Sequence, residues 1–433
     1  MPLNVAVVGS GPSGFYTVAA LLKLAPGCRI DVIERLPTPF GLIRGGVAPD
    51  HQKTKNVWRA YEKSALQEAV RFFGNVEVGR DVTIDELKRM YDAVVLAVGS
   101  PLDRNLGIPG EDKKGVFGAA SFVGWYNGHP DFRTLDPNLD VKAAAVIGNG
   151  NVAIDCARVL AKTPEEMATT DLTAYAAEAI HNAPLTDIYM CGRRGPGDAK
   201  FTNVELREMG ELLDCTPVVD ARQLDEGVPA DLDDRDRRLR ERNLETLREF
   251  TTQTPGGRKK RLHFMFYASP VEVLGGDRVE GIRMERTAVR DGRAVGSGEY
   301  FEIPCGLVIA AIGYDGTPFP GLPFDRKRGV VVHENGRIGD GVYAVGWIKR
   351  GPTGVIGTNK HDGDLAAEQI REDGPAGGKP GREALEAHLR GKGVRWVSYA
   401  DWKKIDAAEI AGAHAGAPRR KFSSVEEMLA LLG

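Results

Sequence analysis

Short apolar runs that end in glycine recur along the chain, and this pattern predicts buried strands that lead into tight turns. Apolar residues at helical spacing follow the first of these turns, over residues 15–24, and predict a helix there. Buried strands that alternate with helices are typical of an α/β fold with parallel sheets. The runs cover residues 5–8, 93–98, 144–147, 307–312 and 342–345, and they precede Gly9, Gly99, Gly148, Gly313 and Gly346.

The pattern between these runs predicts further elements. Helical spacing of apolar residues over 55–73 predicts one long helix that stops at Gly74. A highly charged segment with a thin apolar stripe, residues 235–250, predicts a surface helix. Glycine and proline over 374–381 predict a flexible connection to a C-terminal extension. A capping-box pattern at 424–427 predicts the start of the last helix in this extension.

The first glycine turn has the form of a dinucleotide-binding fingerprint. Gly9 permits the tight turn, Gly11 lets the backbone approach a pyrophosphate, and Gly14 lets the following helix pack on the strand. A second strand over 29–33 ends at Glu34, which lies 20 residues beyond Gly14. Its carboxylate is placed to accept a ribose hydroxyl. A glycine turn that serves only a close strand-to-helix contact is the alternative.

The second glycine turn, at residues 148–153, leads to a different strand end. The next apolar strand, residues 188–191, runs into Arg193 and Arg194 instead of an acid. Two guanidinium groups there would bind a 2′-phosphate, which a carboxylate would repel. The sequence therefore predicts NADP(H) rather than NAD(H) at this turn; two solvated surface arginines are the alternative. Since the apolar runs at 93–98 and 307–312 are expected where the chain leaves and re-enters a first domain, this turn lies in an inserted domain.

Composition narrows the class of protein. A chain of 433 residues is long enough for two domains with separate cores. Lys and Arg total 57 against 60 Asp and Glu, for a net charge of -3, and this balance argues against general nucleic-acid binding. There is no charged-then-apolar leader and no apolar run of about 18 residues, so we expect a cytoplasmic protein with no membrane segment.

The cysteines exclude one group of flavoproteins. Flavoproteins that reduce disulfides need a cysteine pair, whereas no C-x-x-C occurs in this chain, and we expect neither a redox disulfide nor a metal site. Two nucleotide turns in one chain point to electron transfer, and without a cysteine pair the electrons must leave by another route. The five solitary cysteines are Cys28, Cys156, Cys191, Cys215 and Cys305.

Seven sequence blocks resemble the adrenodoxin reductase family of ferredoxin-NADP reductases. They are GSGPSGFY at 9–16, PFGLIR at 39–44, GVAPDH at 46–51, FVGWYN at 122–127, GNGNVA at 148–153, GRRGP at 192–196 and WIKRGPTGVI at 347–356. The resemblance implies a glutathione-reductase-like flavoprotein with two dinucleotide-binding domains. An NADP-binding domain, residues 104–302, would be inserted into an FAD-binding domain, residues 1–103 and 303–433, with an extension from about residue 382.

The resemblance also implies the site residues. Family members place a histidine and a glutamate near the nicotinamide and flavin, and these match His51 and Glu208. One block departs from the family, because residues 196–202 read PGDAKFT where relatives often carry Leu-Gln after the Gly-Pro. FAD contacts are expected at Gly9, Gly11, Ser13, Gly14, Glu34, Leu42, Val78, Trp347, Gly354, Val355 and Ile356, and NADP(H) contacts at Asn149, Gly150, Asn151, Val152, Arg193, Arg194, Glu205 and Gly354.

The expected reaction is hydride transfer from NADPH to the flavin, followed by release of single electrons to a ferredoxin. Ferredoxins are acidic, so a basic docking surface is expected. Acids such as Asp236 interrupt the first candidate group, and a solvated helix face is equally open there. The candidates are Arg235, Arg237, Arg238 and Arg240, with Lys259, Lys260 and Arg261 also possible.

Two other functions share both glycine turns. One is a flavin monooxygenase or quinone-reducing oxidase, and the other is a flavin subunit of a larger complex. The sequence names neither the ferredoxin nor the terminal electron acceptor, and a monomer is the simplest expectation.

Overall fold

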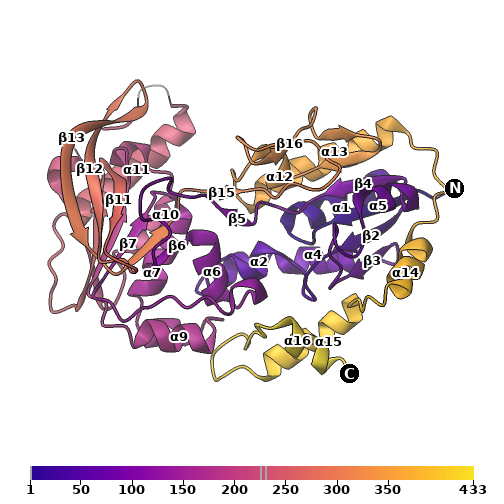
Figure 1. The fold of residues 1–433 in the computed structure, drawn as a ribbon, viewed down its shortest axis with the longest axis horizontal. Helices are drawn as coiled ribbons and strands as arrows, with labels where there is room; N and C mark the ends of the chain where they lie inside the picture. Colours follow the sequence, from indigo (N-terminus) through magenta and orange to yellow (C-terminus); the bar gives the residue numbers. More distant parts are fainter. Residues whose placement is uncertain (1, 225–226, 230–231) are drawn as a thin grey trace. The chain divides into compact units, whose positions relative to one another are not determined.

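The chain forms two compact units (Figure 1), and the computed structural model describes residues 2–224, 227–229 and 232–433. The first unit comprises Met1–Leu102, Asn127–Pro130 and Tyr314–Gly433, and the second comprises Asp103–Tyr126 and Asp131–Gly313. The second unit is thus an insertion in the first. The sequence-based limit at residue 303 falls inside strand β13, whereas this unit extends to Gly313.

A six-stranded sheet forms the centre of the first unit. Its order is β18-β19-β4-β1-β2-β3, and the strands from β19 to β3 run parallel while β18 is antiparallel to its neighbour. The strands are β1 (Asn4–Val8), β2 (Arg29–Ile33), β3 (Val70–Phe73), β4 (Ala93–Leu96), β18 (Arg337–Gly339) and β19 (Val342–Ala344).

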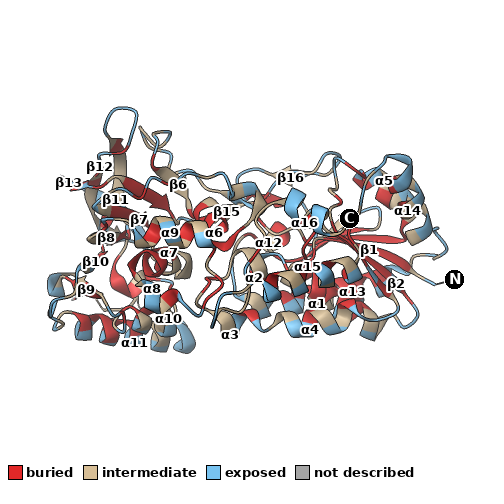
Figure 2. Ribbon diagram, turned by 90° about the horizontal axis from the view of Figure 1, so that it is seen from below, coloured by how far each residue is buried: buried red, intermediate tan, exposed pale blue. Residues whose placement is uncertain are grey.

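Helices cover both faces of this sheet, because its strands are apolar on both sides. Val5 and Val7 of β1 pack in the core formed with α1 and α13, whereas Ala6 and Val8 pack toward α5 and α14. Figure 2 shows the strands buried and the helices exposed on their outer sides. The helices are α1 (Pro12–Leu24), α2 (Leu42–Gly45), α3 (Gln52–Lys55), α4 (Trp58–Ala65), α5 (Ile84–Met90), α12 (Trp347–Arg350), α13 (Asn359–Asp373), α14 (Arg382–Gly391), α15 (Tyr399–Ala411) and α16 (Val425–Leu431).

The second unit has a six-stranded parallel sheet in the order β6-β14-β7-β8-β10-β9. Helices including α7 (Asn151–Ala161), α9 (Ala174–His181), α10 (Asn203–Glu208) and α11 (Asp234–Phe250) contribute to the core on one face. The antiparallel strands β11 (Ala268–Leu274), β12 (Gly281–Arg290) and β13 (Arg293–Pro304) cover the other. The parallel strands are β6 (Val116–Gly118), β7 (Ala143–Ile147), β8 (Asp187–Cys191), β9 (Cys215–Val219), β10 (Lys260–Met265) and β14 (Leu307–Ala310).

One predicted element is wrong. The single helix expected over residues 55–73 ends at Ala65, and Val70–Phe73 instead forms strand β3 in parallel with β2. The sequence of this strand, VRFF, is rich in β-branched and aromatic residues, and its hydrogen bonds to β2 place it at the edge of the sheet. Tertiary pairing therefore overrides the helical spacing.

Candidate functional site

The first glycine turn, residues 9–14, joins β1 to α1 and is crowded at two of its three glycines. Gly9 has φ +103°, and a Cβ there would collide with the carbonyl oxygen of Ala97. A Cβ on Gly14 would collide with the carbonyl oxygen of Gly9. Around Gly11, by contrast, the nearest described atom to an added Cβ is the Cα of Gly41, at 3.9 Å. The turn therefore has open space at the N-terminus of α1, where free N–H groups favour an anion.

Glu34 is held in place at the end of β2. Its Oε2 accepts hydrogen bonds from the Ser10 backbone N–H at 3.0 Å and from Ser10 Oγ at 2.6 Å, and its Oε1 accepts one from the Leu36 N–H at 3.1 Å. Because a carboxylate offers about four acceptor positions, it can still accept a hydroxyl from a ligand. Ser10 joins the first turn to this acid, and the sequence analysis did not single it out.

The second glycine turn joins β7 to α7 and repeats the geometry of the first. Gly148 has φ +146°, and a Cβ there would collide with the carbonyl oxygen of Ala311. No described atom lies within 4 Å of a Cβ on Gly150, and Ala153 is fully buried where a third small residue is needed. The buried Oδ1 of Asn149 has no hydrogen-bond partner among the described residues. A buried polar atom beside an open turn fits a bound polar ligand.

The loop after β8 carries the two predicted arginines. Arg193 is exposed, whereas Arg194 forms an ion pair with Asp198 at 3.0 Å. Asn151 accepts a hydrogen bond from the Thr202 N–H at 2.8 Å, so this side chain ties the loop to the second turn. Val152, the next predicted contact, is half-buried at the start of α7.

Glu205 and Glu208 lie on α10, where they meet a buried arginine that the sequence analysis missed. The side chain of Arg158 is fully buried, with Nη1 at 3.0 Å from Glu205 and Nε at 3.5 Å from Glu208. Its Nη2 lies 2.7 Å from Asp155, one turn earlier on α7. A buried guanidinium with three carboxylates can fix the positions of two predicted site residues. Only the i,i+3 spacing of Asp155 and Arg158 hints at this in the sequence.

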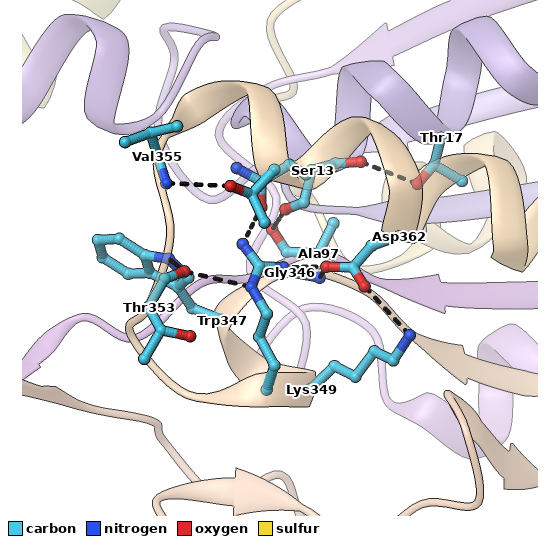
Figure 3. A network of polar contacts seen from close by, with 12 residues as sticks. Ser13, Thr17, Ala97, Gly346, Trp347, Lys349, Thr353, Val355 and Asp362 are labelled. Carbon is cyan, nitrogen blue, oxygen red and sulfur yellow. Dashed lines mark hydrogen bonds and ion pairs between the residues drawn. The ribbon is translucent and has the colours of Figure 1, made fainter. Parts of the chain in front are cut away.

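A third glycine turn begins at Gly346, after β19, and is built around one carboxylate (Figure 3). Asp362 of α13 accepts a hydrogen bond from the Gly346 N–H at 3.1 Å, and it pairs with Lys349 at 3.1 Å and with Arg350. Burial, together with neighbouring Arg350, lowers the pKa of Lys349. The sequence analysis did not identify Asp362, because its partners lie up to 16 residues away and no motif marks them.

The predicted FAD contacts in this third turn are also placed by hydrogen bonds. Trp347 Nε1 donates to the Thr353 carbonyl at 3.2 Å, and the Val355 N–H donates to Thr358 Oγ1 at 3.1 Å. A Cβ on Gly354 would lie 2.7 Å from Thr358 Oγ1. Ile356 begins a short 3-10 helix and is half-buried.

The remaining predicted residues of the first unit are Ser13, Leu42, Val78 and His51. Ser13 Oγ donates to the Ala97 carbonyl at 3.5 Å (Figure 3). Leu42 is the first residue of α2 and 46% exposed, and Val78 is half-buried after β3. His51 is half-buried and directly precedes α3.

Two glycine turns of this geometry, each joining a parallel strand to a helix, define the class as proteins with two dinucleotide-binding domains, as the sequence predicted. Residues 3–181 match the sequence profile of the family described as pyridine nucleotide-disulphide oxidoreductase.

Full-length relatives narrow this class to one family. The chain is 42% identical to the mitochondrial NADPH:adrenodoxin oxidoreductase of Homo sapiens, over 99% of this chain and 92% of that protein. It is 43% identical to the NADPH-ferredoxin reductase FprA of Mycobacterium tuberculosis, over 99% and 98%. The solved structure of that FprA in complex with NADPH has a TM-score of 0.95 at 41% identity, over 100% of both chains. The chain belongs to the adrenodoxin reductase family of NADPH-ferredoxin reductases, as the sequence blocks predicted.

Proposed function

We propose that this protein is an FAD-containing NADPH-ferredoxin reductase that accepts a hydride from NADPH and passes electrons singly to a ferredoxin-type iron-sulfur protein. The observation that carries this assignment is the contrast between the two strand ends. Glu34 follows the first glycine turn, whereas Arg193 and Arg194 follow the second. An acid suits the ribose hydroxyls of FAD, and a pair of cations suits the 2′-phosphate of NADPH.

The residues fit both cofactors. The open space at Gly11 and Gly150, each at a helix N-terminus, accommodates a pyrophosphate. The Oδ1 of Asn149 has no hydrogen-bond partner among the described residues and can accept a hydrogen bond from a ligand. When bound, FAD supplies the chemistry that converts a two-electron donor into a one-electron donor. We assign FAD to Gly9, Gly11, Ser13, Gly14, Glu34, Leu42, Val78, Trp347, Gly354, Val355 and Ile356, and NADP(H) to Asn149, Gly150, Asn151, Val152, Arg193, Arg194 and Glu205.

We assign proton handling and ring positioning to His51 and Glu208. An imidazole can both accept and donate a proton, so His51 can serve as a proton carrier. Arg158 would fix the carboxylate of Glu208 for the same purpose. The expected result for His51→Gln is slower bleaching of flavin absorbance after anaerobic mixing with NADPH in stopped flow. An unchanged rate would remove His51 from the mechanism.

The docking surface for ferredoxin is assigned to the start of α11. Arg235 and Arg238 are exposed there, whereas Arg240 donates to the Gly197 carbonyl at 2.8 Å. Lys260 donates to a carbonyl oxygen and Arg261 pairs with Asp187, so these two cations are less available to a partner. Exposed cations steer an acidic partner and lose this effect as salt rises.

Replacing Arg235 and Arg238 by Glu should raise the KM for ferredoxin by about tenfold at low salt, which corresponds to about 1.4 kcal/mol. NADPH-dependent ferricyanide reduction should not change. The matched control is the same charge reversal at the exposed Arg290 and Arg293 of the β12–β13 hairpin. An equal effect of both pairs would reject this docking surface.

The reaction itself is tested by anaerobic reduction of cytochrome c with NADPH, with and without a panel of ferredoxins. We expect rapid reduction only when a suitable ferredoxin is present. In a separate aerobic assay, rapid oxygen uptake during NADPH oxidation without ferredoxin would instead identify an oxidase. None of the helices in the described ranges is long and apolar enough to cross a membrane. We place the enzyme in the cytoplasm as a monomer.

A further inference from the structure

The two arginines that follow β8 have different surroundings. Arg193 is exposed. Its backbone carbonyl accepts a hydrogen bond from Thr287 Oγ1 at 2.7 Å. The side chain of Arg194 is 32% exposed, and its Nη1 lies 3.0 Å from Oδ1 of Asp198. Asp198 thus occupies part of the guanidinium edge of Arg194 and leaves Arg193 open to a ligand.

Asp198 is held firmly in the loop. It ends a short 3-10 turn, Pro196–Asp198, in which its own N–H donates to the Gly195 carbonyl at 3.0 Å. Arg240 of α11 donates to the Gly197 carbonyl at 2.8 Å, and a Cβ on Gly197 would collide with the carbonyl of Gly227. The backbone at Gly197, next to Asp198, is therefore held by α11 and by its packing against Gly227.

A carboxylate paired with Arg194 opposes the binding of a phosphate dianion at that guanidinium, because it competes for the same N–H donors. Lys200, two residues further along, is exposed and adds a cation to the loop, but its backbone is fixed by a hydrogen bond from its N–H to the Asn149 carbonyl at 2.8 Å.

We infer that Asp198 is a specificity-determining residue that weakens this enzyme's preference for a 2′-phosphorylated nucleotide by holding Arg194. This inference rests on the proposed function, because it requires that Arg193 and Arg194 receive the 2′-phosphate.

The test is calorimetric titration of the full chain with adenosine 2′,5′-bisphosphate and with adenosine 5′-monophosphate. Removing the carboxylate charge by Asp198→Asn should tighten binding of the bisphosphate by about fivefold, since an ionised partner is replaced by a neutral one. Binding of the monophosphate should change by less than about twofold, because it has a hydroxyl and no phosphate at the 2′ position. Unchanged or weaker binding of the bisphosphate overturns the inference.

The control variant is Asp277→Asn. Asp277 is exposed in the turn between β11 and β12. This variant removes the same charge from the same unit and should leave the affinities for the bisphosphate and the monophosphate unchanged. If Asp198→Asn proves unstable in a thermal melt, Asp198→Gln replaces it.

A double-mutant cycle shows whether Arg194 is the target. In an Arg194→Gln background, Asp198→Asn should tighten the bisphosphate by less than about twofold, since the competing pair no longer exists. A full fivefold gain in that background overturns the proposed competition for Arg194. A wild-type chain that does not distinguish the two nucleotides would instead overturn the assignment of NADPH to this site, which is a different result from a failure of Asp198 alone.

Discussion

Asp362 is the buried carboxylate on which the third glycine turn depends. It accepts the Gly346 N–H and pairs with two cations, Lys349 and Arg350. Its side chain is 8% exposed and that of Lys349 is 11% exposed, so both charges have lost most of their water. Removal of one partner from such a group leaves uncompensated charge in the interior.

Replacement of Asp362 by Asn should therefore lower the free energy of unfolding of the first unit by about 3 kcal/mol, as expected when one member of a buried ion pair is removed. The measurement is urea unfolding followed by tryptophan fluorescence, because Trp58, Trp347, Trp396 and Trp402 all lie in that unit. Glu368→Gln, at an exposed position of the same helix, is the control and should cost less than about 0.5 kcal/mol. A similar loss in both variants would contradict the role of Asp362.

The position of a glycine within the turn determines whether it is needed for close packing of the backbone or for the approach of a ligand. Gly148 and Gly150 are two residues apart in the second turn, yet a Cβ on Gly148 collides with backbone and one on Gly150 meets no described atom within 4 Å. The crowded position is required by the fold. The open position is required only if a nucleotide approaches the turn.

Alanine at these two positions should separate the two requirements. Gly148→Ala should lower stability by more than about 2 kcal/mol, because φ +146° and the Ala311 carbonyl both oppose a side chain. Gly150→Ala should melt within about 2 °C of the wild type, since the change in stability is small. Its affinity for NADP⁺, measured by calorimetry, should fall about tenfold, or about 1.4 kcal/mol. Unaltered affinity in Gly150→Ala would show that no ligand approaches this turn.

Elements with a local signature could be predicted from the sequence, and elements set by distant contacts could not. Strand β2 and helix α1 follow from apolar runs and a glycine turn, whose stereochemistry is local. Strand β3 was assigned to a helix, because only its pairing with β2 determines its conformation. For the same reason the contacts of Arg158 with Glu205 and Glu208 escaped prediction, because they are set by how α7 and α10 pack.

At the scale of the whole chain, the C-terminal extension is anchored by apolar residues such as Trp402 and Ile405, which join the core of the first unit, and by buried charges. Arg382, at the start of α14, pairs with the buried Asp31 of β2 at 2.8 Å. Glu409 of α15 is 1% exposed and accepts hydrogen bonds from Arg44 and from the Phe422 N–H at 2.8 Å. Arg44 lies on α2 beside Leu42, so the extension supports a segment assigned to FAD.

The distribution of cysteines over the chain gives a test of the electron route. All five are buried and none forms a disulfide. Burial raises the pKa of every one of these thiols, to about 12 for Cys215 and Cys305. The thiolate is the nucleophilic form, and at pH 8 it is scarcely populated in the folded chain.

Iodoacetamide at pH 8 should therefore modify less than about one thiol per folded chain, since reaction needs an accessible thiolate. In denaturant all five should react, as counted by intact mass. Preincubation with NADPH should leave the folded result unchanged, because a reductase that passes electrons to an iron-sulfur partner has no need to generate a reactive dithiol. A gain of two modified thiols after NADPH would instead reveal a cysteine pair that takes part in the reaction, and would contradict direct transfer from flavin to ferredoxin.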